Sequence, residues 1–232
     1  GGLQGVSLLE TNNILSVMLK KIAHLSYYDF EGGSSFYAYR SHKFTQKLNE
    51  FSSKMFVLEK KKNDKSIVKL DDYRVIKVSK KFAFFFMRGK NKFSFYNYGN
   101  YAINRVEQID EILNFKPTSI IIYNNSNFIH PKIINFLYNK DISIYFYLMD
   151  MELITGGCHY NLNCNNFKST CDKCPASVFP VNNLASKNLK IKNNFFKDIE
   201  ITFLSPNKKV LDDIKNSKIF NSKKHKCKLL YL

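Results

Sequence analysis

The feature of this sequence that most constrains its fold is an alternation of apolar runs with helix-like segments. Residues 22–26 form a short apolar run, and the turn of residues 27–33 ends it with two glycines. A helix is predicted next, followed by another strand at residues 54–58. Strand, glycine turn, helix and strand together indicate the opening of a βαβ unit.

The helix of this unit is predicted to begin at Ser34, because Ser34 or Ser35 can serve as its N-cap. Its apolar side chains at helical spacing are Tyr37, Phe44, Leu48 and Phe51. A one-sided apolar stripe of this kind normally faces the core. The prediction is therefore that these aromatic and aliphatic side chains pack against the sheet.

The same alternation returns later in the chain. Strands are predicted at residues 119–123, 142–148, 199–204 and 227–232, and helices at residues 101–113, 131–138 and 207–216. The run at residues 142–148 is continuously apolar, as in strands of a parallel sheet that are buried on both faces. The sequence thus predicts an α/β fold with a doubly wound, mainly parallel sheet.

The pattern is poorer between residues 60 and 116, where an insertion is expected. Residues 60–64 are basic and polar and predict a surface loop. Residues 82–88 combine aromatic with basic side chains, which can stack on single-stranded nucleic acid or simply pack in a core.

The chain carries a net charge of +17, which favours an anionic partner such as nucleic acid, a membrane surface or a phosphorylated ligand. The abundance of Lys, Asn and Ile also fits a bias in base composition. No apolar run approaches the roughly 20 residues that span a bilayer. Residues 1–17 lack the features of a secretory signal, so the predicted compartment is the reducing cytoplasm.

Two segments are expected at one mouth of the sheet, because ligands of open α/β sheets lie beyond the carboxyl ends of the strands. The first is the glycine turn at Gly32 and Gly33, where bare backbone before a helix can approach a phosphate. A plain turn would use the same residues.

The second segment is Asp150 with the turn Thr155, Gly156 and Gly157 after it. At the end of a buried strand, a carboxylate can hold a sugar hydroxyl or orient a substrate. It can equally cap the following loop through backbone amides. The residues leave both roles open.

Four of the five cysteines cluster directly after this turn, at Cys158, Cys164, Cys171 and Cys174. Four thiolates from one short segment suit tetrahedral zinc, and the last two have the C-x2-C spacing of zinc knuckles. His159 could replace one of them. Two disulfides or reduced thiols are the alternatives. Four thiolate ligands would leave no open position, so no catalytic metal is expected.

These segments resemble the N-terminal half of bacterial family 4 glycosyltransferases of capsule, exopolysaccharide and lipopolysaccharide assembly. The similar segments are residues 20–33, 38–40, 53–55 and 203–208. The cysteine segment is the sharpest match, because relatives of the colanic acid glycosyltransferases carry a Thr-Gly-Gly-Cys-His-Tyr-like turn and then a Cys...Cys-x2-Cys-Pro run. In this chain the turn occupies residues 155–160 and the run ends at Pro175.

The resemblance implies a GT-B enzyme in which two Rossmann-like domains close over a nucleotide-sugar donor and transfer a hexose with retention. Residues 18–232 would be the acceptor-side domain, residues 1–17 an extraneous segment, and the C-terminal donor domain would be absent, leaving this part alone inactive. The Gly32-Gly33 loop would touch the donor diphosphate, and Asp150 with residues 155–157 would line the sugar site. The implied partners are the donor, a glycan or lipid-linked acceptor, and an anionic membrane at the inner face of the cell.

Two departures from the family pattern stand out. The histidine expected before Asp150 is Met149, and residues 123–126 lack the histidines often found near the end of the preceding strand. A thioether cannot donate a proton as imidazole does. An altered donor, reduced activity or a non-catalytic remnant therefore remain open, as does a zinc-containing nucleic-acid-binding module suggested by charge and cysteines.

Overall fold

The computed structural model describes residues 19–71, 101–123, 126–176 and 183–231. Seven parallel strands form one sheet in the order β3-β2-β1-β4-β5-β6-β7. The strands are β1 (Lys20–Tyr28), β2 (Phe51–Glu59), β3 (Ile67–Lys69), β4 (Ser119–Ile122), β5 (Ser143–Tyr147), β6 (Ile201–Ser205) and β7 (His225–Leu229). The predicted α/β class and parallel sheet are confirmed, and the architecture is consistent with a Rossmann-like fold.

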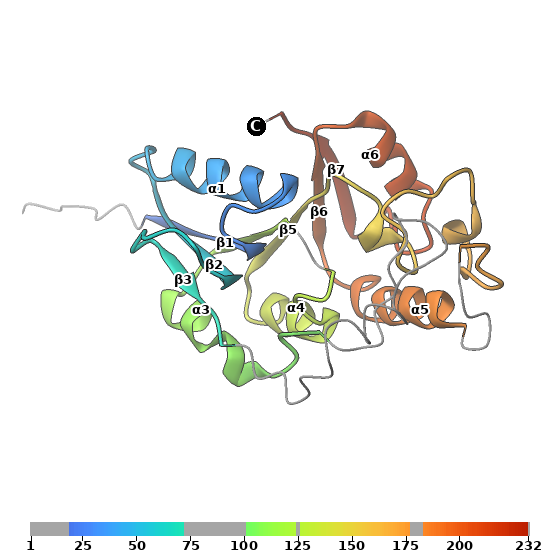
Figure 1. The fold of residues 1–232 in the computed structure, drawn as a ribbon, viewed down its shortest axis with the longest axis horizontal. Coiled ribbons are helices and arrows are strands. Elements are labelled where there is room, and N and C mark those ends of the chain that lie inside the picture. Colours follow the sequence, from blue (N-terminus) through green and yellow to red (C-terminus); the bar gives the residue numbers. More distant parts are fainter. Residues whose placement is uncertain (1–18, 72–100, 124–125, 177–182, 232) are drawn as a thin grey trace, which may run out of the picture.

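Helices cover both faces of this sheet (Figure 1). They are α1 (Gly33–Thr45), α3 (Asp110–Phe115), α4 (Pro131–Tyr138), α5 (Leu184–Phe196) and α6 (Lys208–Lys215). Three 3-10 turns are η1 (Val106–Ile109), η2 (Glu152–Ile154) and η3 (Asn166–Lys168). Among the described helices, none combines the length and the apolar character needed to cross a bilayer.

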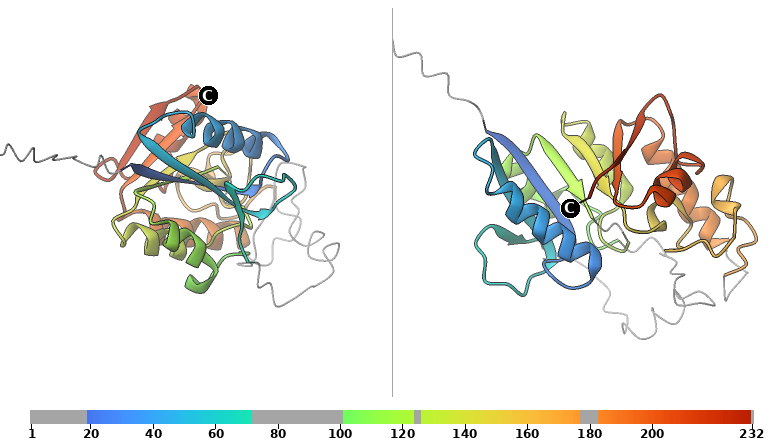
Figure 2. Two further views of the ribbon diagram at one scale, coloured as in Figure 1. Left: turned by 90° about the vertical axis from the view of Figure 1, so that its left-hand side faces the viewer. Right: turned by 90° about the horizontal axis from the view of Figure 1, so that it is seen from above.

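Two apolar clusters fill the space on the two sides of the sheet. The larger cluster joins inward side chains of α3, α4, α5 and α6 to one face of the strands. The smaller one lies under α1 and includes Ala38, Tyr123 and Tyr147. Figure 2 shows α1 on one side of the sheet and α3, α4 and α5 on the other. The chain order reverses between β1 and β4, which makes this the switch point of the sheet.

The predicted inner face of α1 is only partly found, because Tyr37 packs against the smaller cluster but Phe44 and Leu48 do not. Its buried side chains are small or polar, namely Ser35, Ala38, Ser41, His42 and Thr45. Phe44 and Leu48 are exposed instead, and Phe51 begins β2. The N-cap is Gly32 rather than a serine, and it makes no side-chain capping bond. Small side chains let the helix lie close to the sheet, where Ser35 Oγ and Ser26 Oγ are 2.9 Å apart.

Elsewhere the predicted elements are found with shifted ends. The helix expected at residues 101–113 is shorter, because Ile103 pairs with Ile129 in a bridge and helical structure begins only at Val106. Neither β3 nor α5 is predicted by the sequence pattern. Helix α4 matches its predicted bounds, with Pro131 in its first turn. The expected aromatic-basic segment at residues 82–88 lies outside the described residues, as do residues 1–17.

Candidate functional site

The structure brings the glycine turn and the end of β5 together at the carboxyl edge of the sheet. β1 is followed by Gly32 and Gly33, and β5 by Met149 and Asp150. A Cβ atom built on Gly33 would lie 3.9 Å from Met149 Cε, so the two segments are in side-chain contact range. Both glycines are exposed.

The start of α1 leaves backbone amides without the usual capping groups. Gly32 has φ 81° and ψ 165°, a conformation that side-chain-bearing residues avoid. Its carbonyl accepts the first helical hydrogen bond from the Phe36 N–H at 3.0 Å. The first turn of α1 contains no acidic side chain. The helix end therefore presents N–H groups and the positive end of its dipole.

Asp150 pairs with His159 at the same edge. Asp150 Oδ2 lies 2.7 Å from His159 Nδ1, and Asp150 Oδ1 accepts the Glu152 N–H at 2.9 Å. Of the two roles left open for this carboxylate, the capping of the following loop is found, through Oδ1. The other oxygen is paired with an imidazole, and contact with a substrate stays a prediction. The two side chains are 35% and 30% exposed, so a ligand can reach them.

The pairing also sets the state of the imidazole. Burial by itself would lower the pKa of His159, but the hydrogen bond and charge of Asp150 outweigh it and raise the pKa. A proton on Nδ1 donated to Asp150 leaves Nε2 facing away from the carboxylate. The sequence placed His159 among the zinc ligands and missed this role. Its only signal was a histidine shortly after a strand that ends in aspartate.

The Thr155 turn is a buried structural element. The Thr155 hydroxyl accepts the N–H of Cys158 at 2.9 Å and donates to the Cys158 carbonyl at 2.8 Å. A Cβ atom on Gly156 would lie 2.3 Å from the Ala185 carbonyl oxygen, so glycine is needed for the close approach of α5. Thr155, Gly156 and Gly157 are all buried. Contact between these three residues and a nucleotide-sugar donor stays a prediction. Their burial does not support it.

A buried ion pair fastens this turn to α5. Lys192 Nζ donates to Glu152 Oε1 at 2.8 Å and to the Thr155 carbonyl at 3.1 Å. The Lys192 side chain is only 2% exposed and that of Glu152 only 8%. Asn188, one turn before Lys192, donates to the Gly156 carbonyl at 3.1 Å. The sequence missed this group because α5 itself was not predicted.

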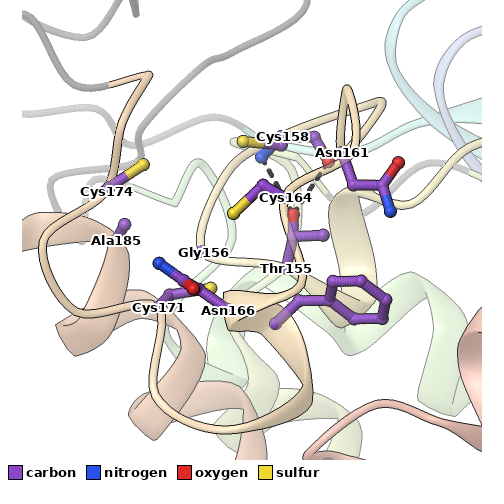
Figure 3. Close-up of a pocket in the computed structure, with 10 residues that line it drawn as sticks. Thr155, Gly156, Cys158, Asn161, Cys164, Asn166, Cys171, Cys174 and Ala185 are labelled. Carbon is purple, nitrogen blue, oxygen red and sulfur yellow. Dashed lines mark hydrogen bonds between the residues drawn. The ribbon is translucent and has the colours of Figure 1, made fainter.

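All four clustered cysteines line one small pocket beside the Thr155 turn (Figure 3). The pocket has a volume of about 20 Å³, which is the space of a single water molecule or ion. Phe167 and Ala185 complete its apolar wall. Cys227 lies apart on β7. The sequence cluster is therefore also a cluster in space.

Four thiols are suitable ligands for a metal ion, but their side chains are not placed so that they could hold one. In the described part of the chain, no three His, Cys, Asp or Glu side chains are arranged so that they could hold a metal ion. None of the five cysteines forms a disulfide. Burial raises the pKa of the Cys171 thiol to about 11, and bound zinc would have to overcome that cost. The zinc site thus stays a prediction.

A second polar group that the sequence missed lies under α1. His24 Nδ1 is 3.0 Å from the Tyr123 hydroxyl, and the ring of His42 bridges Ser53 and Ser66. Burial lowers the pKa of His24 to about 3 and that of His42 to about 4. Both rings are therefore neutral core groups at physiological pH.

Comparisons of the chain with protein-family models, curated proteins and solved structures give no match.

Proposed function

We propose that this chain is the acceptor-side part of a retaining glycosyltransferase that moves a hexose from a nucleotide-sugar to a surface-glycan precursor. The observation that carries the proposal is the Asp150–His159 pair beside the glycine turn, at the carboxyl edge of a parallel sheet. This edge is where open α/β sheets bind ligands. The family resemblance of the sequence adds the reaction class.

Different residues at this edge would recognise different parts of the donor. The N–H groups after Gly32 would meet the donor diphosphate, since a helix N-terminus without acidic side chains favours anions. Asp150 and His159 would hold a hydroxyl of the transferred sugar. His159 matches the histidine of the family's own Thr-Gly-Gly-Cys-His-Tyr-like turn, and it would be the imidazole that remains beside Asp150 where the preceding histidine of the family is Met149.

The cysteine segment would have a supporting role. Glu152 and Lys192 hold the turn before the segment, and a structural zinc ion among Cys158, Cys164, Cys171 and Cys174 would fix the loop that carries His159. Such an ion would take no part in the chemistry, since a closed set of thiolates leaves no open position. The acceptor would be a glycan or lipid-linked precursor at the inner face of the cell membrane.

The test is sugar transfer by the product of the complete reading frame, in membranes from cells that express it. Asp150→Asn and His159→Phe should each lower transfer by about a hundredfold, the usual size of a lost acid-base or orienting group. Asp198→Asn is the matched control, because this carboxylate is 76% exposed just after the C-terminal end of α5. Transfer by Asp150→Asn and His159→Phe at the level of the Asp198→Asn control would contradict the proposed site.

A complete absence of transfer from every nucleotide-sugar offered would instead favour a non-catalytic remnant of the same fold. Salt-sensitive binding of RNA or DNA by the same preparation would favour the nucleic-acid-binding alternative.

A further inference from the structure

The outer side of α1 carries large apolar side chains in contact with solvent. Phe44 is 62% exposed, Phe36 39% and Leu48 38%, and Phe30 in the preceding turn is 41% exposed. Phe30 and Phe36 are in edge contact, with ring centroids 5.4 Å apart. Exposed apolar groups are ordinary when scattered, but here they follow one helix and its two ends.

Cationic side chains lie between these apolar groups. Arg40 Cζ is 5.5 Å from the centroid of the Phe36 ring, and Lys62 Nζ is 3.9 Å from that of Phe30. Lys47 is exposed next to Leu48. We call Phe30, Phe36, Arg40, Phe44, Lys47 and Leu48 the α1 face.

Two of the carboxylates near the α1 face are paired within the protein, whereas Glu50, two residues after Leu48, is exposed. Helix α1 contains no acidic residue. Of the neighbouring carboxylates, Asp64 pairs with Lys43 at 3.2 Å and Glu31 pairs with Lys61. The face therefore keeps an excess of positive charge, from Arg40 and Lys47 against Glu50, with aromatic and aliphatic side chains around it.

The α1 face is also open and next to the candidate site. In Figure 1 and Figure 2 no other described element lies over the outer side of α1. The helix begins at the glycine turn, so Phe30 and Phe36 flank the candidate donor site. A flat surface that contacts the α1 face would lie beside the carboxyl edge of the sheet.

We propose that the α1 face docks on an anionic lipid bilayer. Aromatic and aliphatic side chains insert at the boundary of headgroups and acyl chains, while Lys and Arg meet anionic headgroups. A helix groove of a partner protein fits less well, because Arg40 interrupts the apolar seam between Phe36 and Phe44. Nucleic acid fits less well because Phe44 and Leu48 offer nothing to a phosphate backbone.

Within the basic run at residues 60–62, Lys60 Nζ donates to the Ile67 carbonyl at 2.7 Å and Lys61 pairs with Glu31. Lys62 lies over Phe30 and adds its charge to the edge of the α1 face. The proposal does not require the glycosyltransferase function. If both hold, the bilayer presents a lipid-linked acceptor beside Asp150.

The test is co-sedimentation of the chain with vesicles of phosphatidylcholine mixed with phosphatidylglycerol, and with vesicles of phosphatidylcholine alone. Two double variants remove the two kinds of contact separately: Phe44→Gln with Leu48→Gln, and Arg40→Gln with Lys47→Gln. Each should weaken partitioning onto the anionic vesicles by at least about tenfold, because each cation and each buried apolar group contributes independently.

Two control pairs make the same kinds of substitution at exposed residues away from the α1 face. Lys208→Gln with Lys209→Gln removes two exposed charges from α6, and Leu162→Gln with Tyr231→Gln removes two exposed apolar side chains. Both control pairs should bind the anionic vesicles within about twofold of the unchanged chain. Circular dichroism and urea unfolding of every variant should match the unchanged chain.

The proposal is overturned if the unchanged chain does not bind anionic vesicles, or if the α1 double variants bind as well as the control pairs. It is also overturned if only the charge variants lose binding, because that result indicates loose adsorption without insertion. Because the assay contains no sugar donor, its result is separate from that of the transfer test.

Discussion

At the scale of single residues, the glycine pairs at residues 32–33 and 156–157 differ in what their surroundings require. Gly156 is required by packing, because a Cβ atom would lie 2.3 Å from the backbone oxygen of Ala185. Gly33 meets no such limit, since its nearest neighbour would be Met149 Cε at 3.9 Å. Packing thus explains Gly156 without a ligand, whereas the structure gives no packing reason for Gly33.

This contrast predicts opposite effects of one substitution. Gly156→Ala should lower the free energy of unfolding by about 3 kcal/mol, because α5 must move to admit the methyl group. Gly33→Ala should change it by less than about 0.5 kcal/mol, since the methyl group enters open space at the start of a helix. Urea unfolding monitored by circular dichroism measures both. Equal destabilisation by the two substitutions would contradict the packing argument.

The site residues could be predicted from sequence only where position along a strand determines them. Asp150 and the glycine turn were predicted correctly to meet at one edge, because parallel strands carry their ends to the same side. The partnership of Asp150 with His159 was not predicted, because it depends on how the loop after η2 folds back. Lys192 was missed for a similar reason, since its partner lies forty positions away.

At the scale of elements, sequence periodicity succeeded where a helix has one clearly apolar side. Helix α6 buries Val210, Leu211 and Ile214 as predicted, and Asn207 caps it through a bond to the Lys209 N–H. Helix α1 departs from this rule, because small and polar side chains face the sheet, Tyr37 and Tyr39 are only partly buried, and Phe36 and Phe44 face solvent. Burial of His42 is tolerated because Ser53 and Ser66 satisfy both ring nitrogens.

The cysteine segment supports a prediction about metal content. Four thiols around a pocket of about 20 Å³ should bind one zinc ion per chain in protein purified under reducing conditions. Cys164→Ser should lose the zinc, whereas Cys227→Ser should keep it because Cys227 lies on β7 outside the cluster. Elemental analysis and thiol titration measure this. Four titratable thiols without zinc, or two disulfides in their place, would contradict the prediction.

At the scale of the whole molecule, the two proposed sites adjoin each other at the start of α1. The carboxyl edge holds the Asp150–His159 pair and the glycine turn, while the α1 face runs away from that edge along the outside. The core on the other side of the sheet holds α3, α4, α5 and α6. This arrangement lets the molecule rest α1 on a bilayer while the edge stays open to a donor.

The measurement that tests the central claim most directly is saturation-transfer NMR between this chain and a panel of nucleotide-sugars, which detects weak binding. We predict saturation of sugar protons for at least one donor, its loss in Asp150→Asn, and its retention in Asp198→Asn. Absence of saturation for every donor, or equal saturation in the two variants, would contradict a donor site at the Asp150–His159 pair.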